Sequence, residues 1–281
     1  MSRPPTPDPL PTSIQGVLDA LDAILDWASE EQSRLGYFAV LYKQVTQRVK
    51  DGIDGDFFDN GPRMERLDVV FANRYLEALG QYSRGESPSE VWRVAFEAAD
   101  LWRPLILQQL LLGINAHINL DLGVAAAEIA PGEALEDLRH DFDRINEILF
   151  SMVAQVEHAI GEVSPWIAWL ERVGGKAGDA IVRFSLSVAR QGAWRLASRL
   201  APREHSAWPP LIERRDQNSV KIARDILDPG LLVGWGLLLI RMRESSDVRR
   251  ILAALDRGSQ GSDFSSLEAR RIERPALDAN C

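Results

Sequence analysis

Residues 105–127 are the feature that most limits how this chain can fold. Apolar residues fall on all sides of a helical axis there, instead of forming one stripe. They are Leu105, Ile106, Leu107, Leu110, Leu111, Leu112, Ile114, Ile118, Leu120, Leu122 and Val124. A helix that is apolar all round is a buried helix, so the segment predicts a fold arranged around a central helix.

The remaining sequence predicts more helices and little or no sheet. Apolar residues recur at helical spacing over about 14–25, 34–49, 64–79, 133–161 and 177–200. Alternation with a period of two, which a half-buried strand needs, is not sustained anywhere. The predicted fold class is therefore all-α, a multi-helix single domain that 281 residues are enough to build.

The two ends of the chain differ in composition from the helical part. Residues 1–11 hold closely spaced prolines, which prevent a helix, and are predicted to be a disordered or extended leader. Residues 258–281 are polar and charged and are predicted to be a disordered tail. The helical domain is thus expected over residues 12–257.

The overall charge and the single cysteine exclude several classes of function. The net charge is −9, so no large basic surface for nucleic acid is expected. Cys281 is the one cysteine, so no disulfide forms within the chain, which fits a reducing compartment. The first residues lack the apolar core of a secretory signal, and the cytoplasm is therefore the expected location.

A second apolar run covers residues 230–240. It has only half of the roughly 20 residues that a membrane span needs, so no span is predicted. The run suggests instead either the interface of a homo-oligomer or a lid over an apolar substrate. The sequence does not separate these two interpretations.

Five polar residues interrupt the central segment. At about 100° per residue, Gln108, Asn115 and Asn119 form one stripe, and His117 and Asp121 form another, roughly opposite. A buried polar group without a partner costs about 1–3 kcal/mol, so both stripes need partners. The five residues form either a hydrogen-bond network that fixes helix packing or a functional site, and the use of both faces favours a site.

His117 and Asp121 are four residues apart, so both side chains could reach one metal ion. His158 and Glu162 repeat this spacing on the following helix and could complete a ligand set for a divalent metal, zinc or iron. In spacing, the two pairs resemble those of the bacterial zinc-dependent phospholipase C group, an all-helical family of metal hydrolases. That group also uses further histidines and its N-terminus as ligands, whereas this chain has four histidines and a longer gap between the pairs.

Four residues on other helices are further candidates. Asp141 falls on an apolar face of its helix, so it should point inward and could orient His117 or act as an acid or base. Asn146 lies nearby and is a candidate for ligand binding. Arg183 and Arg190 share one side of a helix and could bind an anionic group of a ligand. Structural ion pairs and aromatic packing are the alternative interpretation of all four.

Several short motifs together resemble a bacterial domain family of unknown function. The clearest is the run Asn115-Ala-His-Ile-Asn-Leu-Asp121. The others are Phe71-Ala-Asn-Arg-Tyr-Leu, Trp92-Arg-Val-Ala-Phe, Asp141-Phe-Asp-Arg-Ile-Asn, Ser164-Pro-Trp and Ala189-Arg-Gln-Gly-Ala-Trp. The resemblance spans about residues 40–205. It supports this choice of residues and implies no particular reaction.

Three functions fit these residues. The first is an enzyme for a small, largely apolar substrate in an internal pocket, with His117 as general base or metal ligand and Asp121 and Asp141 as its partners. Metal-assisted hydrolysis of an ester or phosphoester is its most concrete form. The second is a metal-free cyclase or isomerase of specialised metabolism, in which His117 and Asp121 move a proton. The third is a non-catalytic ligand-binding or interaction protein whose polar residues only fix packing.

Overall fold

Within residues 2–164, 177–228 and 237–257, which the computed structural model describes, every regular element is a helix. In chain order the elements are α1 (Ile14–Glu31), α2 (Gly36–Asp54), α3 (Gly61–Arg84), α4 (Glu90–Asp100), α5 (Ile106–Ala116), the π-helix η1 (His117–Asp121), α6 (Leu122–Ile129), α7 (Ala134–Val163), α9 (Ala177–Leu200), the 3-10 turn η2 (His205–Ala207), α10 (Pro209–Leu227) and α12 (Val248–Arg257). The predicted all-α class is confirmed.

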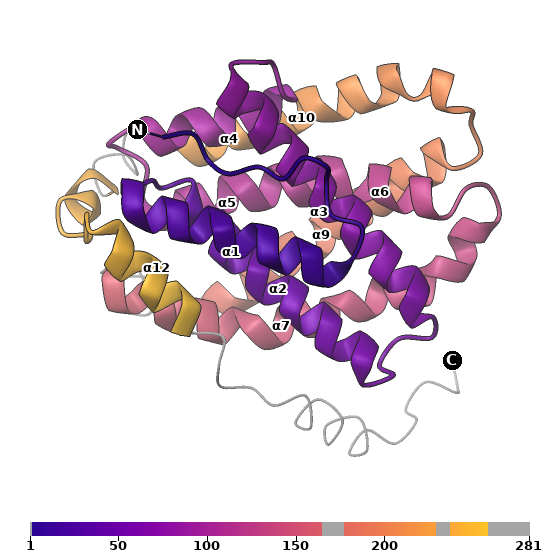
Figure 1. The fold of residues 1–281 in the computed structure, drawn as a ribbon, viewed down its shortest axis with the longest axis horizontal. Coiled ribbons are helices and arrows are strands. Elements are labelled where there is room, and N and C mark those ends of the chain that lie inside the picture. Colours follow the sequence, from indigo (N-terminus) through magenta and orange to yellow (C-terminus); the bar gives the residue numbers. More distant parts are fainter. Residues whose placement is uncertain (1, 165–176, 229–236, 258–281) are drawn as a thin grey trace.

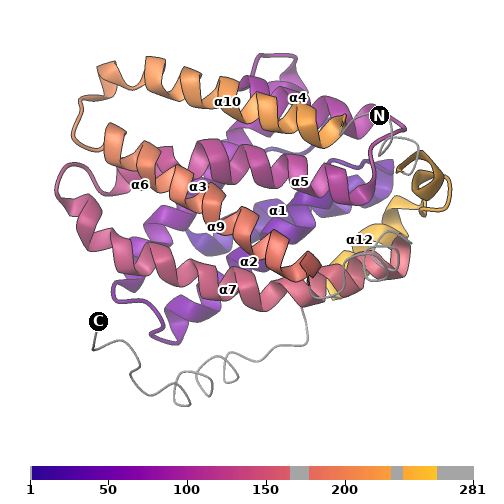
Figure 2. The same cartoon turned by 180° about the vertical axis from the view of Figure 1, so that it is seen from behind.

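The predicted central helix is the continuous rod made of α5, η1 and α6. It packs directly against α2, α3, α4, α9 and α10. In Figure 1, α1 and α2 lie in front of it, and Figure 2 shows α9 and α10 on its opposite side. Most of its apolar residues are accordingly buried, and Leu107, Leu111 and Ile114 are partly buried.

This rod is also long and apolar enough to span a membrane, over Ile106–Ile129. Within its most apolar window, 78% of the segment is buried inside the fold. The central position of the helix therefore accounts for its hydropathy without a membrane. Most of the apolar run at residues 230–240 lies outside the described residues.

The described residues of the leader at residues 1–11 form no helix, as the closely spaced prolines predict. The segment runs in an extended conformation along the first helices (Figure 1). The Ser2 hydroxyl donates to Glu31 at 2.7 Å, and the Asn73 amide donates to the Pro11 carbonyl at 2.9 Å. Prolines prevent a helix but not order, because these side chains supply partners for an extended backbone. Residues 258–281 lie outside the described part of the chain.

The π-helix η1 is the one irregularity within the central rod. It covers His117–Asp121, between two ordinary α-helical stretches. A π-helical turn is rare and less favourable than an α-helical one, and such turns occur frequently at functional sites. The unusual backbone therefore coincides with the two residues that the sequence singles out as a possible reaction centre.

Candidate active site around His117

His117 lies inside a cage of aromatic side chains. Only 3% of the residue is exposed. Its imidazole stacks on the Phe71 ring of α3, with 3.5 Å between ring centroids and 11° between planes. The Tyr42 ring of α2 meets it edge-on at 4.4 Å, and Phe38 and Trp92 also contact it. Because three helices supply this cage, the imidazole is fixed in orientation and shielded from water.

Asp121 holds one side of the imidazole. Its Oδ2 lies 3.5 Å from His117 Nδ1, which is long for a hydrogen bond. The same carboxylate accepts a hydrogen bond from Trp92 Nε1 at 2.8 Å and one from Arg74 Nε at 3.0 Å. Both oxygens of Asp121 are thus engaged by groups from α3 and α4, so the carboxylate is a fixed partner for Nδ1.

The other imidazole nitrogen, Nε2 of His117, is buried and has no hydrogen-bond partner. Burial lowers the pKa of His117, and the hydrogen bond with Asp121 only partly opposes this effect. The imidazole is therefore neutral near neutral pH. When its one proton lies on Nδ1 facing Asp121, Nε2 is a free proton acceptor inside the protein.

The Tyr42 and Thr46 hydroxyls lie close enough to interact with each other, but three further buried polar groups between α2 and α3 have no partner in good hydrogen-bond geometry. They are the Tyr42 hydroxyl, the Thr46 hydroxyl and Asp68 Oδ2. Tyr42 and Thr46 are one turn apart on α2, and Asp68 is one turn before Phe71 on α3, so the three belong to the faces that enclose His117. Three unpartnered polar atoms in one region are costly, and a ligand that supplied their partners would remove that cost.

Burial also keeps these groups protonated. It raises the pKa of Asp68 to about 8, with a smaller contribution from Glu65. Burial, followed by the charge of the nearby Asp68, raises the pKa of Tyr42 well above its usual value. Near neutral pH this region therefore offers a carboxylic acid and a phenol as hydrogen-bond donors, beside a neutral imidazole.

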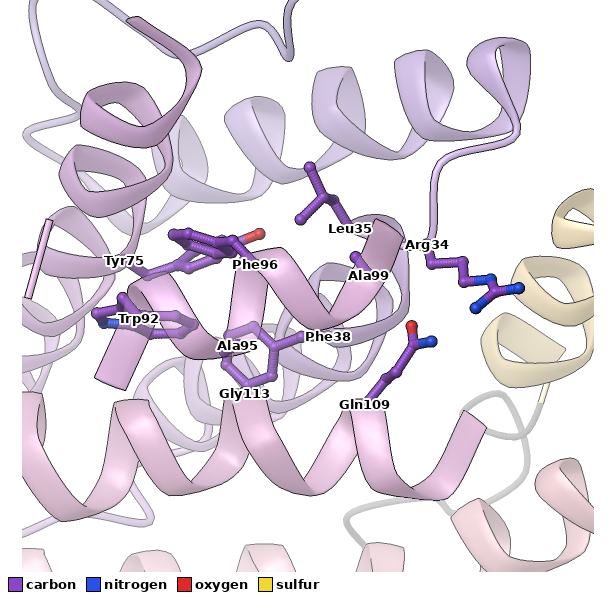
Figure 3. Close-up of a pocket in the computed structure, with 10 residues that line it drawn as sticks. All are labelled: Arg34, Leu35, Phe38, Tyr75, Trp92, Ala95, Phe96, Ala99, Gln109 and Gly113. Carbon is purple, nitrogen blue, oxygen red and sulfur yellow. The ribbon is translucent and has the colours of Figure 1, made fainter. Parts of the chain in front are cut away.

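A narrow cavity of about 20 Å³ approaches this region from the surface. Figure 3 shows its inner wall, formed by Phe38, Tyr75 and Trp92, and its outer end, where Arg34 and Gln109 face each other. The three inner aromatic side chains are all in contact with the His117 ring. The cavity has room for about one water molecule, and its inner aromatic side chains separate it from His117.

A comparison with family models assigns the chain. The model of DUF5995, a family of unknown function, matches residues 14–229. The chain belongs to DUF5995. No curated protein and no solved structure matches it. The matched range contains every residue of the site around His117, so that site is part of the DUF5995 domain itself.

The amide stripe of the central helix faces α10 in this DUF5995 chain. Asn115 donates to the Ser219 carbonyl at 2.9 Å, and Asn119 donates to Asn115 Oδ1 at 2.9 Å. Arg215 Nη2 completes the chain of contacts by donating to Asn119 Oδ1 at 2.7 Å. The two predicted stripes are confirmed, but the hydrogen bonds of Asn115 and Asn119 hold α10 against the rod and are not available to a ligand.

Asp141 points inward, as predicted, but it is not a partner of His117. It is fully buried and accepts hydrogen bonds from the Asp59 and Asn60 backbone N–H groups at 2.7 and 3.1 Å. Its Oδ2 also accepts one from Arg63 Nη2 at 2.9 Å. Arg63 lies eleven residues before Arg74, the partner of Asp121, so the two arginines start about 16 Å apart along α3. Asp141 therefore anchors the start of α3.

The four predicted metal ligands do not come together. His117 is buried, whereas the side chain of His158 is 82% exposed and pairs with Glu162 on the outer face of α7, at 3.7 Å. Glu162 also pairs with Arg257 of α12. The spacing of four residues recurs on any helix, and here one pair faces the core while the other faces solvent.

Among the described residues, one other cluster, Asp59, His140 and Asp141, has metal-ligating groups within 4.8 Å of one another. Arg63 pairs with Asp141 and Arg144 pairs with Asp59, so protein cations already balance its charge. His140 Nδ1 meets Asp59 Oδ2 at 2.5 Å as well. The residues of this cluster therefore pair with one another and with the two arginines, as in a structural ion-pair network.

The remaining candidates belong to α7 and α9. Arg190 is buried, donates to the Phe142 carbonyl and lies over the Phe142 ring at 4.4 Å. Burial lowers its pKa to about 9. Asn146 keeps a buried Oδ1 without a partner, and the side chain of Arg183 lies outside the described part of the chain. Arg190 thus packs the two helices of this DUF5995 domain together.

Proposed function

We propose that the protein is a metal-free enzyme that moves a proton on a small, largely apolar substrate. The observation that carries the proposal is the free, buried Nε2 atom of His117, on an imidazole whose other nitrogen faces a fixed carboxylate. A neutral histidine in this state is the usual general base of enzymes. Isomerisation and cyclisation are the reaction classes that such a base can begin.

Each residue has a distinct part in this proposal. His117 Nε2 takes the proton from the substrate. Asp121 is a positioning residue, because it holds the Nδ1–H tautomer and stabilises the imidazolium that forms. Asp68, with a pKa near 8, donates its proton or a hydrogen bond to an oxygen of the substrate. Burial lowers the pKa of His117 and raises the pKa of Asp68. Acid–base catalysis uses such a pair, in which one group accepts a proton and the other donates one.

The surroundings of His117 set the substrate class. Phe38, Tyr42, Phe71 and Trp92 would form an apolar wall around the reacting atoms. Polar donors are few and lie together at Tyr42, Thr46 and Asp68. A pocket of this kind suits a compact apolar skeleton with one oxygen function, such as an enone or a cyclic ketone. Because the cavity is narrow, binding requires the aromatic wall to move.

The same geometry disfavours the metal-assisted alternative. Arg74 already balances the charge of Asp121, and both carboxylate oxygens accept hydrogen bonds, from Arg74 and Trp92. His158 and Glu162, the other members of that ligand set, lie on the surface of α7. Proton transfer needs none of these additional ligands.

Hydrogen exchange in D₂O tests the proposal without knowledge of the natural substrate. Small enones and cyclic ketones would be incubated with the protein, and deuterium at carbon measured by mass spectrometry. We expect the wild type to accelerate exchange of at least one compound, and His117→Gln to reduce that rate by a factor on the order of 10²–10⁴. His158→Gln, which changes an exposed histidine, is the matched control and should retain the full rate.

The proposal is wrong if a folded His117→Gln variant exchanges as fast as the wild type. It is also wrong if no compound exchanges while His117→Gln and Asp68→Asn only alter the free energy of unfolding. In that case the polar residues serve packing alone.

A further inference from the structure

Exposed apolar side chains gather at one place on the surface. The described residues include six large hydrophobic side chains that are exposed, and four of these are Leu101 and Trp102, each 53% exposed, Leu239 at 61% and Met242 at 60%. The first two lie between α4 and α5, and the last two are three residues apart, in and just after the helical residues 237–241. We call these four residues the Trp102 patch.

Arg241 joins the two halves of this patch. Its Nε donates to the Trp102 carbonyl at 2.7 Å, and its guanidinium lies 5.5 Å from the centre of the Trp102 ring. Arg241 itself is buried beside Glu244, which accepts hydrogen bonds from the Ile106 backbone at 3.2 Å and from the Ser164 hydroxyl at 2.6 Å. The backbone that carries the exposed apolar side chains is therefore held by buried, hydrogen-bonded residues.

The patch adjoins the outer end of the cavity whose inner wall contacts the His117 ring. Arg34, which lines that end in Figure 3, donates from Nη1 to the Leu101 carbonyl at 2.6 Å. Ala99 lines the same end, two residues before Leu101. An apolar molecule resting on the Trp102 patch would thus be next to this cavity.

Two exposed arginines and one exposed acid, Asp100, border the patch in the sequence, so its border is positive on balance although the chain as a whole is acidic. Arg103 follows Trp102 directly, and Arg243 follows Met242. Both arginines are exposed, and no ion pair of either occurs within the described residues. Exposed apolar side chains beside free arginines are complementary to a bilayer surface that carries anionic headgroups, since tryptophan prefers that interface and each cation is attracted to it.

We propose that the Trp102 patch docks on an anionic lipid bilayer. With the proposed function, on which this step rests, the bilayer would deliver an apolar substrate to the cavity beside Arg34. A second copy of the chain fits the patch less well. A symmetric dimer through this patch would place Arg103 and Arg243 of one copy close to the same arginines of the other, and these like charges repel.

Vesicle sedimentation tests the docking surface directly. The full-length protein would be mixed with vesicles of phosphatidylcholine alone and of phosphatidylcholine with phosphatidylserine. We expect binding to the anionic vesicles that weakens in high salt. The double variant Trp102→Ser/Met242→Ser should weaken it by about tenfold or more, because two apolar anchors are lost. Arg103→Ser/Arg243→Ser should weaken it by about fivefold for each arginine.

Ile222→Ser is the matched control, because Ile222 is a 44% exposed apolar residue on α10 outside the patch, and its loss should leave vesicle binding unchanged. His117→Gln should also bind vesicles normally, so a failed exchange assay and a failed docking assay can be told apart. Absence of binding to either vesicle would overturn the docking proposal. So would a concentration-dependent dimer that only the Trp102→Ser/Met242→Ser variant abolishes, because a second copy would then cover the patch.

Discussion

Asp121→Ala should lower the free energy of unfolding by about 3–5 kcal/mol. Asp121 is 2% exposed and is the shared acceptor for Arg74, Trp92 and the His117 imidazole. Removing the carboxylate leaves the Trp92 N–H without a partner and the Arg74 cation without its counter-charge. A buried donor that loses its acceptor costs the full desolvation of that group, which is why the effect is large. Chemical denaturation of the two proteins measures it.

Asp143→Ala is the matched control for this prediction. Asp143 also pairs with a nearby arginine, Arg139, at 2.7 Å, but the two side chains are 48% and 42% exposed. An exposed pair contributes less than about 1 kcal/mol, because water solvates both charges once the pair is broken. If both variants lost the same free energy of unfolding, the pairs of Asp121 would contribute no more than a surface ion pair. Asp121 would then not hold His117 in place as described above.

Asp68→Asn should make the protein more stable at alkaline pH and remove part of its pH dependence. Asp68 has a pKa of about 8 in the folded protein, against about 3.9 in an unfolded chain. Below about pH 4 the carboxyl group is protonated in both states. As the pH rises toward 8, the unfolded state loses the proton and the folded state keeps it, so the free energy of unfolding falls.

Between about pH 4 and pH 8, Asp68 lowers the free energy of unfolding by an amount on the order of 5 kcal/mol. Above pH 8 this effect levels off, because Asp68 ionises in the folded state too. The asparagine variant has no such group, so the difference in stability between variant and wild type should grow with pH and then become constant. Denaturation curves at several pH values measure this difference. A difference that does not change with pH would show that Asp68 ionises normally in the folded protein.

Much of the fold could be predicted because it depends on local pattern. The central helix was expected over residues 105–127 and covers Ile106–Ile129. Its two polar stripes follow from helical geometry alone, and the structure places Asn115 and His117 on the faces toward α10 and α2, respectively. The π-helix was not predicted, because no sequence pattern distinguishes it from an ordinary helical turn.

The partners of the predicted residues could not be read in the same way, because they come from distant parts of the chain. Trp92 and Arg74 meet Asp121 across 29 and 47 residues. Tyr42 and Thr46 belong to a helix whose periodicity is that of any amphipathic segment, so their burial without partners became visible only in three dimensions. Asp68 did carry a signal, as a lone acid among Met64, Leu67 and Phe71 on one face of its helix.

The error over the metal ligands has the same physical origin. A histidine and an acid four residues apart share a helix face, but the spacing does not say whether that face meets the core or water. His117 and Asp121 meet the core, and His158 and Glu162 meet water. Only the packing of the other helices decides this.

Nitrogen-15 NMR of the His117 imidazole tests most directly whether this side chain is a base. We expect a neutral ring near neutral pH with its proton on Nδ1, an unprotonated Nε2, and a titration midpoint below the usual value of about 6.5. Asp121→Asn should disturb this tautomer, and the exposed His158 provides an internal reference signal. A neutral ring that carries its proton on Nε2, or a midpoint at or above 6.5, would show that His117 is not the buried base proposed above.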